Sequence, residues 1–523
     1  MILQLSENQN NLLLPSSSEM SAYDQSTISE GVAASVLMGR AGEKMAEIIR
    51  NRYVNSSNSK NLKILIVCGP GNNGGDGLVV ARLLKKEVAQ LQVVRIQSEK
   101  YSKENEIEFE KFRNTGNAVL SGKLDATLER AISEADIIVD ALLGIGQTKP
   151  LRGEILELVK GINKFGKNSK VISLDLPTGI NADNGKVYDA HLDAENTITV
   201  EFIKRGMLQQ PAVKACGQVD TISIGIEAHE TSEFALLLGS NLPQFLEREP
   251  DSHKGKFGHV LVLGGSKNYP GAPILSSHAA LRSGAGLVTY ACLSSAQSKN
   301  TFPELMLRLL KDRDGSYQAS HFSALKRELE QFTCLVIGPG MGRSKPAKEF
   351  FVKVLDHIVK SGIPAVIDAD GLNLLSEIIN SGKSKVKLKL PNCVLTPHPG
   401  EMGKLLNLET TEVQEDRYSA VRALSKKLGC VTVLKGSETI VYAGANGFVN
   451  LTGNPYMASG GAGDVLSGII AALMAQGYSP GEAAKLSVYL HGFSADLLLQ
   501  QNRAPMLASD IIAHIPEAIS KLK

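Results

Sequence analysis

Short runs of Val, Ile and Leu alternate with helix-length amphipathic segments along most of the 523-residue chain. Such alternation is typical of a parallel β-sheet whose two faces are both covered by helices. The runs of the first half that we expect to form strands are Leu62–Cys68, Leu91–Ile96, Ile137–Leu142, Val171–Leu174, Thr197–Val200 and Val219–Ile224. Apolar residues at helical spacing predict a helix before these strands, over Thr27–Arg50.

The alternation lapses after these strands and resumes at His259. The strands expected in the second half are His259–Leu263, Leu287–Ala291, Cys334–Ile337, Ala365–Ile367, Cys393–Thr396, Val431–Leu434 and Thr439–Tyr442. Between the halves, Glu247–Gly255 is charged and contains a proline, which is typical of a linker. Because 523 residues exceed what one hydrophobic core usually holds, we predict a boundary near residues 225–250 and two domains, over 1–227 and 236–521.

The composition is that of an ordinary soluble globular protein, with 43% hydrophobic and 21% charged residues. A net charge of +2 gives no excess that would indicate binding to nucleic acid or to a membrane. No apolar run approaches the roughly 20 residues that span a bilayer. The N-terminal Leu run also lacks the basic residues that begin a signal peptide. We therefore expect a cytoplasmic protein whose partners are small molecules.

The six cysteines are scattered singly, without Cys-x-x-Cys pairs or nearby histidines. Most of them lie in or beside apolar runs that we expect to be strands. This arrangement favours buried thiols in a reducing compartment over disulfides. The ten histidines also lack the spacing of metal ligands, so the sequence does not support a zinc centre.

A glycine-rich loop follows the first expected strand and precedes a predicted helix over Leu78–Lys86. Gly69, Gly71 and Gly74 fit the pattern G-x-G-x-x-G, in which a helix N-terminus offers unpaired N–H groups to a phosphate. A purely structural turn stays open as the alternative. An ordinary dehydrogenase is disfavoured, because the next strand ends without an acidic residue for a ribose, and because the loop carries two asparagines and an aspartate that a pyrophosphate cradle does not need.

Two later strand ends carry matching polar residues. Asp140 ends one expected strand, and Asp175 ends the next, with Thr178 shortly after it. Ligands of doubly wound sheets bind outside these carboxyl ends. A single aspartate there is more often a helix cap or a turn former. Three such residues in the expected places can instead supply oxygen ligands for a hard cation and a carboxylate base.

The strongest chemical pattern of the second half is Gly460-Gly-Ala-Gly-Asp464, which opens an apolar helical run over Ile469–Met474. Small residues allow backbone N–H groups to surround an anion at a helix start, where the helix dipole favours negative charge. A carboxylate beside an anion site fits a base that takes a proton from the hydroxyl accepting a phosphoryl group. The alternative is a glycine-rich turn in which Asp464 is only the N-cap. No P-loop motif is present.

Several motifs of the first half resemble the NAD(P)H-hydrate epimerases. They are GPGNNGGDG (69–77), VDALLGIGQTKPLRG (139–153) and LDLPTG (174–179). This resemblance implies a Rossmann-like three-layer α/β/α fold and a potassium ion held by Asn73, Asp140 and Thr178. The residues that it places against the hydrated dinucleotide are Asn72, Asn73, Gly74, Gly75, Asp76, Gly144, Ile145, Gly146, Gln147, Thr148, Lys149, Pro150 and Asp175. Gly39-Arg40 and Ile145 depart from the family pattern, which has an acidic or amide residue and a threonine at these places.

The second half resembles the ribokinase-like superfamily, and within it the ADP-dependent NAD(P)H-hydrate dehydratases. The matching stretches are SHKG (252–255), LGGS (263–266), YPGAP (269–273), AALRSGAGLV (279–288), IGPGMG (337–342), DADGLN (368–373), TPHPGE (396–401), KGSET (435–439) and GGAGD (460–464). The resemblance implies that ADP is the phosphoryl donor, and we expect Mg²⁺ to accompany it. The residues implied to contact the nucleotide are Lys435, Gly436, Ser437, Glu438, Thr439 and Gly463, and those implied to line the hydrated nicotinamide are Ala272, Gly342, His398 and Asp464.

Together the two resemblances imply repair of NADH and NADPH whose nicotinamide ring has been hydrated at C6. Asp464 is the expected base of an ADP-dependent dehydration of the S form, and Asp175 is the expected base of an epimerase that interconverts the R and S forms. We also expect a homo-oligomer. Two other hypotheses stay open, namely a small-molecule kinase similar to hydroxyethylthiazole kinase, and a first domain that binds a dinucleotide without catalysis.

Overall fold

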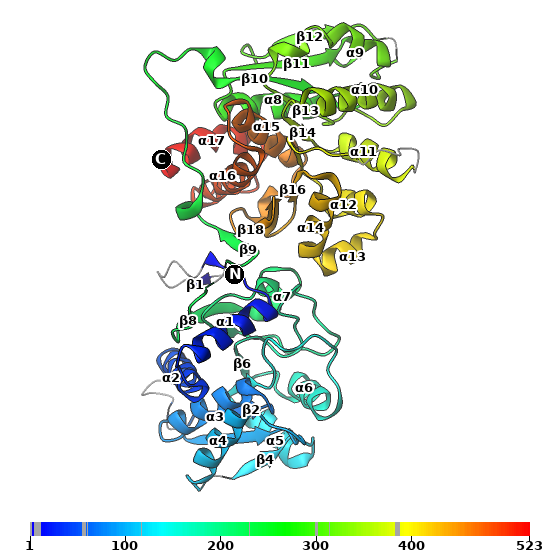
Figure 1. The fold of residues 1–523 in the computed structure, drawn as a ribbon. Helices are drawn as coiled ribbons and strands as arrows, with labels where there is room; N and C mark the ends of the chain where they lie inside the picture. The colour runs from blue at the N-terminus through cyan, green and yellow to red at the C-terminus, as the bar shows by residue number, and fades with distance from the viewer. Residues whose placement is uncertain are drawn as a thin grey trace. The chain divides into compact units, whose positions relative to one another are not determined.

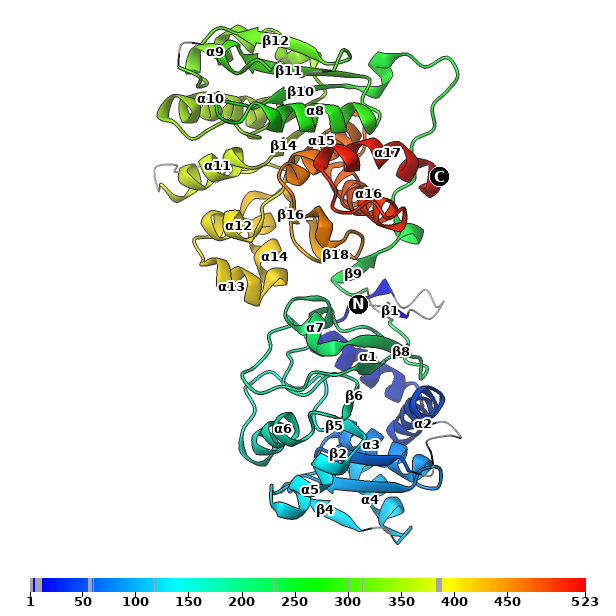
Figure 2. The ribbon, with the colours of Figure 1, turned by 180° about the vertical axis from the view of Figure 1, so that it is seen from behind.

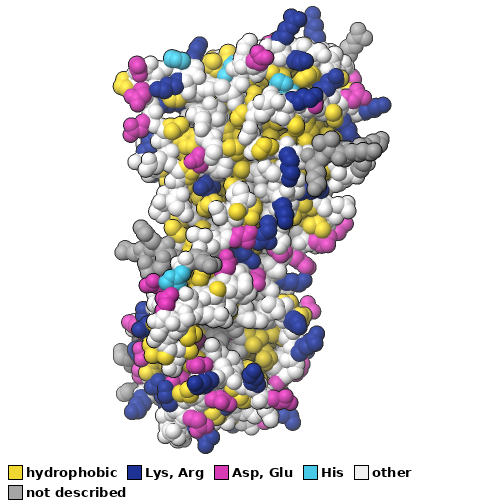
Figure 3. Space-filling view, viewed as in Figure 1, with side chains coloured by type: hydrophobic (Ala, Val, Ile, Leu, Met, Phe, Trp, Pro, Cys, Tyr) yellow, Lys and Arg dark blue, Asp and Glu magenta, His cyan; other side chains and the backbone are white. Residues whose placement is uncertain are grey.

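A computed structural model describes residues 3–4, 12–54, 59, 61–116, 118–229, 231–298, 302–312, 314–381 and 388–523. The chain divides into two compact units, Met1–Phe234 and Ala235–Lys523 (Figure 1, Figure 2). Each unit contains one β-sheet with helices packed against it. Lys and Arg side chains are interspersed with Asp and Glu over the face shown in Figure 3, as the small net charge leads one to expect.

The strands of the first unit form one sheet in the order β1-β8-β7-β6-β5-β2-β3-β4, and its neighbouring strands pair in parallel. The strands are β1 (Leu3–Gln4), β2 (Lys63–Cys68), β3 (Gln90–Arg95), β4 (Val119–Ser121), β5 (Ile137–Ala141), β6 (Lys170–Leu174), β7 (Asn196–Val200) and β8 (Gln218–Ile222). The helices are α1 (Ser17–Ser29), α2 (Ala34–Tyr53), α3 (Asn72–Leu84), α4 (Lys103–Arg113), α5 (Ala126–Glu134), α6 (Gly153–Phe165) and α7 (Ala212–Cys216).

Both faces of this sheet are buried, which confirms the predicted three-layer fold. Along β2, Ile64 and Ile66 face a core shared with α2 and α3. Leu65 and Val67 face the opposite core, shared with α5 and α6. Successive residues of a strand point to opposite faces, so a continuous apolar run such as β2 can fill two cores at once. The chain leaves β2 in one direction toward β3 and returns on its other side with β5.

The single helix predicted over Thr27–Arg50 is wrong, because two helices occupy this region. α1 ends at Ser29 and α2 begins at Ala34, and Gly31 between them has a φ of 107°. A right-handed helix cannot continue through that conformation. The apolar spacing on both sides of the break had suggested one continuous helix.

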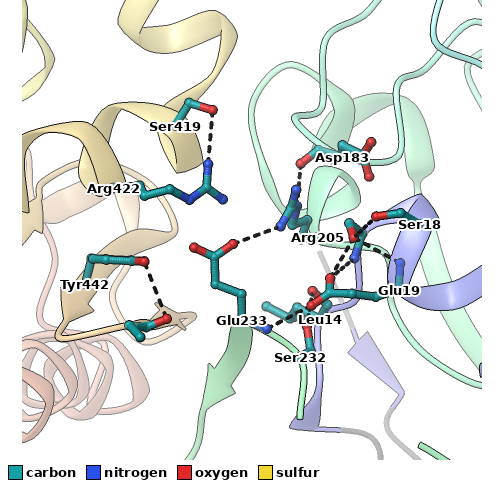
Figure 4. Close-up of polar contacts among 12 residues, drawn as sticks. Leu14, Ser18, Glu19, Asp183, Arg205, Ser232, Glu233, Ser419, Arg422 and Tyr442 are labelled. Carbon is teal, nitrogen blue, oxygen red and sulfur yellow. Dashed lines mark hydrogen bonds and ion pairs between the residues drawn. The ribbon is translucent and has the colours of Figure 1, made fainter. Parts of the chain in front are cut away.

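The start of α1 is fixed to the rest of the unit by polar contacts. Ser16 and Glu19 form a capping box, and the Asp183 carboxylate accepts from the Ser17 N–H at 2.6 Å. Figure 4 shows Arg205 pointing toward Asp183, whose carbonyl oxygen accepts its Nε–H at 3.0 Å. The Glu19 carboxylate also accepts from the backbone N–H of Glu233 at 2.9 Å. α1 is therefore held against the same loops that surround the end of the sheet.

The second sheet has the strand order β12-β11-β10-β13-β14-β15-β16-β17-β18-β9. Its strands are β9 (Phe234–Leu237), β10 (His259–Leu263), β11 (Leu287–Leu293), β12 (Met306–Leu310), β13 (Cys334–Ile337), β14 (Ala365–Ile367), β15 (Cys393–Leu395), β16 (Val431–Leu434), β17 (Thr439–Ala443) and β18 (Asn446–Asn450). The helices are α8 (Gly271–Arg282), α9 (Ala319–Leu325), α10 (Lys345–Ser361), α11 (Asp370–Asn380), α12 (Pro399–Leu406), α13 (Thr410–Glu415), α14 (Arg417–Leu428), α15 (Ala462–Ala475), α16 (Pro480–Gln500) and α17 (Ala508–Leu522).

One face of this sheet packs on α8, α15, α16 and α17, which share a core with β10, β13 and β14. Helices α9 to α12 and α14 lie on its other side (Figure 1, Figure 2). From β12 to β16 the paired strands are parallel, as predicted. β17 and β18 are antiparallel instead. The loops before these two strands are too short for a parallel crossover, which needs a dozen or more residues.

The segment Glu247–Gly255, which we expected to be a linker, lies within the second unit. The Arg248 guanidinium lies 3.9 Å from the Phe257 ring centre and donates to the Gly284 carbonyl. Just before it, the Tyr478 hydroxyl accepts from the Leu246 N–H at 2.7 Å. These contacts attach the segment to the second unit, and the division between the units comes earlier, after Phe234.

The six cysteines are free and buried, which confirms the sequence expectation. Within the described ranges, none of the helices combines the length and apolar character that crossing a bilayer requires.

Two candidate active sites

The first candidate site is a cavity of about 910 Å³ at the carboxyl ends of the strands of the first unit. It lies where the chain leaves the two neighbouring strands β2 and β5 toward opposite sides, which is the usual place for a ligand in such sheets. The loops after β2, β5 and β6 all contribute to its lining. Its apolar wall comes largely from α1 and α2, through Met20, Leu37 and Met38.

Most of the predicted dinucleotide-binding residues line this cavity. They are Asn72, Asn73, Asp76, Gly144, Ile145, Gly146, Gln147, Thr148, Lys149 and Asp175. Gly74, Gly75 and Pro150 are not among the lining residues. Gly75 packs against Met38, and a side chain at Gly74 would overlap the Gly69 carbonyl. These two glycines therefore allow close packing behind the cavity.

The glycine loop is shorter than predicted, because α3 begins at Asn72 and not after Gly77. The helix can start there because its glycines allow close packing; a Cβ at Gly77 would lie 2.6 Å from that of Ala141. Asn105 holds the turn before it, since its side-chain amide donates to the carbonyls of Gly69 and Gly71 at 3.0 and 2.9 Å. Asp76 consequently lies within the helix, with its side chain toward the cavity.

The three residues predicted to hold a potassium ion are brought together around Leu143. The Asn73 amide donates to the Leu143 carbonyl at 2.9 Å, and the Leu143 N–H donates to the Thr178 hydroxyl at 3.2 Å. Thr178 in turn donates to the Asp140 carboxylate at 2.7 Å. Asn73 Oδ1 is buried and has no hydrogen-bond partner within the described part of the chain. A buried acceptor without a donor is the kind of atom that a cation would satisfy.

Asp140 is fully buried at the end of β5. Burial raises its pKa, and the hydrogen bonds from the Thr178, Leu142 and Ser173 groups oppose that rise. Its carboxylate accepts from the Ser173 hydroxyl at 2.9 Å and from the Thr178 N–H at 2.8 Å. The carboxylate therefore fixes the two strand ends to each other, whether or not it also faces a cation.

Asp175 has a partner that the sequence did not reveal. Its carboxylate accepts from the Lys204 ammonium at 2.6 Å, and only 1% of the Lys204 side chain is exposed. Lys204 also donates to the Thr199 hydroxyl and the Val200 carbonyl, at 2.8 and 2.9 Å. Asp175 itself has a φ of 64°, which is uncommon outside glycine and places its side chain next to Gly144. Lys204 lies in no glycine motif, so nothing in the sequence pattern singled it out.

A second carboxyl group missed by the sequence analysis is Asp24, on the cavity side of α1. Burial raises its pKa to about 6, where Lys204 opposes the rise and Asp175 and Glu201 add to it. Burial, and then the nearby Asp175 and Asp24, also hold the pKa of Asp76 well above its usual value. The cavity thus combines one ion-paired carboxylate with two carboxyl groups whose pKa values are raised.

The second candidate site lies at the start of α15, where Gly461 is the N-cap with a φ of 94°. The helix starts at Ala462, earlier than the predicted Ile469, and Asp464 is in its first turn. The alternative in which Asp464 serves as the N-cap is therefore wrong. The Ser276 hydroxyl of α8 donates to the Asp464 carbonyl at 2.9 Å and fixes this turn against α8.

A partly buried lysine, whose side chain is 21% exposed, lies at the centre of the charges in this site. Lys435, just after β16, donates to the Asp368 carboxylate at 2.9 Å and lies 3.9 Å from that of Glu401. Burial lowers the pKa of Lys435, but its carboxylate neighbours outweigh burial and raise it. The Ser467 hydroxyl donates to Asp368 at 2.6 Å. Lys435, together with this hydroxyl, overcomes the effect of burial and lowers the pKa of Asp368.

The other two carboxyl groups of this site, Asp464 and Glu401, have raised pKa values, in contrast to Asp368. Burial, followed by the charge of Asp368, raises the pKa of Asp464 to about 7 against the opposing effect of Lys435. Burial also raises the pKa of Glu401 to about 7. A Cβ on Gly463 would lie 3.4 Å from the Lys435 ammonium, so the helix start and the lysine are immediate neighbours. The structure thus places the predicted base, Asp464, beside the predicted nucleotide residues Lys435 and Gly463.

His398 is held in place by the start of α12. Its Nδ1 accepts from the Gly400 N–H at 3.0 Å, while the Glu401 carboxylate accepts from the His398 N–H at 2.9 Å. Burial, and then the charge of Lys435, lowers the pKa of His398. His398 thus caps α12, and its ring lies close enough to Lys435 for the lysine charge to act on it.

Ala272 and Gly342 lie at the place where the chain leaves β10 and β13 toward opposite sides of the second sheet. The Ala272 carbonyl accepts weakly from the Ser276 hydroxyl, which also contacts Asp464. The Gly342 N–H donates to the Asp370 carboxylate at 2.9 Å. Ala272 is thereby linked to Asp464 through one side chain, while Gly342 belongs to the facing loop.

The loop from Gly436 to Thr439, with Ser437 and Glu438 between them, joins β16 to β17. A guanidinium that the sequence analysis did not identify lies beneath it, because Arg417 of α14 donates to the Leu434 carbonyl at 3.3 Å. A side chain at Gly436, whose φ is 144°, would meet that guanidinium. Burial lowers the pKa of Arg417 to about 10, so it remains charged at neutral pH. No glycine motif surrounds Arg417, and sequence alone offered no signal for it.

Comparisons with known proteins match both halves of the chain. Residues 260–517 match the family model described as NAD(P)H-hydrate dehydratase, and residues 34–206 match the one described as YjeF-related protein N-terminus. The bifunctional NAD(P)H-hydrate repair enzyme Nnr of Moorella thermoacetica is 34% identical over 98% of this chain and 97% of its own length. The enzyme of the same name from Escherichia coli is 35% identical over 94% of this chain and 90% of its own. Among solved structures, the ADP/ATP-dependent NAD(P)H-hydrate dehydratase from Bacillus subtilis matches with 28% identity and a TM-score of 0.44, covering 55% of this chain and 96% of that one.

Proposed function

The chain belongs to the family of bifunctional NAD(P)H-hydrate repair enzymes, and from this premise we propose that each of its two sites performs one half of the repair. The cavity of the first unit interconverts the R and S hydrates at C6 of the nicotinamide ring. The site around Asp464 then dehydrates the S form with ADP, giving NADH or NADPH, AMP and phosphate. The observation that carries this assignment is the placement of Asp464, with a pKa near 7, beside the partly buried Lys435 at a glycine-rich helix start.

Dehydration needs a better leaving group than hydroxide. Transfer of the terminal phosphoryl group of ADP to the C6 hydroxyl supplies one, and the lone pair of the ring nitrogen can then expel phosphate. Asp464 is the base that removes the hydroxyl proton during the transfer, and a pKa near the working pH suits this role. Lys435 and the N–H groups at the start of α15 face the charge that develops on the phosphate.

The nucleotide and the nicotinamide occupy opposite sides of Asp464 in this proposal. Lys435, Gly436, Ser437, Glu438, Thr439 and Gly463 hold the nucleotide, and Ala272, Gly342 and His398 line the ring. Mg²⁺ commonly binds to one or two carboxylates together with substrate phosphates. Asp368 and Glu401, on either side of Lys435, fit that donor set. When bound, Mg²⁺ would neutralise phosphate charge.

In the first unit, Asp175 is the proposed base, acting on the same C6 hydroxyl. Lys204 stabilises its carboxylate, and the side chains of Asn72 and Gln147 face the bound ring and ribose from the cavity wall. Asn73, Asp140 and Thr178 would hold K⁺, which the unpartnered Asn73 Oδ1 supports. When bound, K⁺ would fix the loops after β2 and β5. We further propose that the protein is cytoplasmic and forms a homo-oligomer.

The test is to incubate the purified protein with hydrated NADH, as separate R and S epimers, and ADP. We expect the S form to yield NADH and inorganic phosphate directly, and the R form to do so after a lag. A stable phosphorylated product would instead indicate a small-molecule kinase. If the R form yields NADH no faster than spontaneous conversion of R to S hydrate allows, the first unit only binds dinucleotides.

A further inference from the structure

The cavity of the first unit contains a carboxyl group for which the proposed epimerase chemistry has so far given no role. Asp24 projects from α1 into the cavity lined by Asp175 and Lys204. It has no hydrogen bond or ion pair to any residue that the structure describes. Asp175, by contrast, is engaged by Lys204 at 2.6 Å. Two carboxyl groups, one paired with a lysine and one without a hydrogen-bond or ion-pair partner among the described residues, thus line one cavity of about 910 Å³.

The fixed position of α1 makes Asp24 part of the site and not a mobile surface group. The helix is held at its start by the capping box of Ser16 and Glu19 and by the contact of Ser17 with Asp183. One turn before Asp24, Met20 is buried against the core of the unit, and it lines the cavity as well. The Asp24 side chain therefore lines the cavity from a helix whose start is held by hydrogen bonds, and it shares this cavity with Asp175 at the end of β6.

Epimerisation through ring opening needs an acid as well as a base. When a base removes the proton of the C6 hydroxyl, the C6–N1 bond breaks and its electron pair moves onto N1, which must accept a proton. The open form then has an aldehyde at C6. Rotation about the C5–C6 bond and attack by N1 on the other face of the carbonyl reverse the two proton transfers. The only change is the configuration at C6, and no co-reactant is consumed.

We infer that Asp24 is the general acid of this reaction, delivering a proton to N1 while Asp175 takes the proton of the C6 hydroxyl. The inference rests on the proposed epimerase function. On ring closure each carboxyl group recovers its initial state, so the same pair serves both directions. A catalytic pair of this kind requires two carboxyl groups in different environments, which Lys204 creates by pairing with only one of them.

Several charged groups act on Asp24. Lys204 favours its ionised form, whereas Asp175 and Glu201 favour the protonated form, and Lys149 lines the same cavity. Asp76, from α3, is the other carboxyl group that could donate a proton. Its pKa lies well above the usual value and its burial is deeper, so it favours keeping its proton. We therefore assign Asp76 a hydrogen bond to the substrate. The proton that is transferred to N1 comes from Asp24, whose pKa is about 6.

The experiment uses the full chain with isolated R hydrate and no ADP, and follows the appearance of the S hydrate by chromatography. We expect Asp24→Asn to slow this conversion on the order of 10²-fold, the usual contribution of a general acid. Asp24→Glu should restore part of the rate. Asp189→Asn is the matched control, because Asp189 is exposed and lies outside the cavity lining. ADP-dependent turnover of the S hydrate by each variant checks that the second unit is intact.

The pH profile separates an acid from a merely structural residue. The wild-type conversion should decline as the pH rises above about 6, the pKa of Asp24, whereas Asp24→Asn should lack that decline and Asp24→Glu should retain it. An unchanged rate in Asp24→Asn would overturn the inference, as would a loss confined to Asp76→Asn. If wild-type protein does not convert the R hydrate faster than buffer does, the proposed epimerase function itself is wrong, which is a different outcome.

Discussion

The two sites share an arrangement of charges: each has a lysine among several carboxyl groups. Each contains a lysine that pairs with one carboxylate: the buried Lys204 with Asp175, and the partly buried Lys435 with Asp368. In each, other carboxyl groups nearby have raised pKa values. In the first unit the paired carboxylate is the proposed base. In the second unit the paired carboxylate, Asp368, is not the proposed base, and the unpaired Asp464 has that role instead.

This difference follows from what each lysine must do. A lysine with the proposed role of binding phosphate must be held in place without losing its charge, and the hydrogen bond to Asp368 can do this for Lys435. No phosphate is transferred in the first cavity, so Lys204 can be committed to Asp175 and to the backbone of β7. The comparison teaches that a buried lysine–aspartate pair does not by itself identify the base of a site.

The largest effect should come from Asp464→Asn. Removing the base should lower ADP-dependent turnover of the S hydrate on the order of 10²- to 10⁴-fold, while conversion of R to S hydrate stays at the wild-type rate. Both rates can be measured on one protein sample. Asp356→Asn, which alters an exposed carboxylate on α10, is the control. Equal loss of both activities would mean that the two sites are not independent.

Lys204→Met should have a smaller effect, and on the other activity: it should slow conversion of R to S hydrate and leave the ADP-dependent dehydration unchanged. Without the ammonium, the Asp175 carboxylate, which is only 14% exposed, loses its ion-pair partner; for a fully buried pair such a loss costs about 3–5 kcal/mol. We expect Asp175 to lose the contact that orients it as the proposed base, so that R-to-S conversion falls about 10²-fold and the first unit unfolds at lower temperature. Calorimetry and the two rate measurements check this together. Unchanged epimerisation would show that Asp175 does not need the lysine.

The smallest effect is the difference between the two pH profiles. The second site needs Asp464 as the carboxylate, so its activity should rise with pH, by up to about tenfold per unit, and level off above its pKa of about 7. The first site needs Asp24 protonated, so its activity should decline above about 6. Rates of both reactions from pH 5 to 9 in one buffer series (about two units on either side of the Asp464 pKa) provide the measurement. Parallel profiles would contradict the opposite roles of Asp464 and Asp24.

The sequence was most informative where apolar runs are buried on both faces. The central strands β10, β13, β14 and β16 begin at the predicted residues, since each is a short Val/Ile/Leu run bounded by polar or glycine residues. Edge strands such as β4 and β12 were missed, because partial exposure leaves them without that pattern. The break between α1 and α2 was missed because a single glycine does not interrupt apolar spacing.

The site residues also divide into those that the sequence predicted and those that it did not. Asp464, Asp175 and the Asn72–Asp76 stretch belong to sequence motifs that contain glycine, and these motifs identified them. Asp24 and Lys204 reach the cavity from a helix and from a loop after β7, and only the packing of the unit brings them to it. Their positions depend on contacts between segments far apart in the chain, which no local pattern records.

The contact between Gly69 and Leu142 has a consequence for how the first site could be altered. A Cβ on Gly69 would overlap the Leu142 carbonyl, so the turns after β2 and β5 meet backbone to backbone. At this point the floor of the cavity is made of main chain, and no side chain can be added at Gly69. Variation in the preferred dinucleotide must come from the walls, at positions such as Met20, Leu37 and Ile145. An engineer seeking new specificity would diversify those positions and leave the turns untouched.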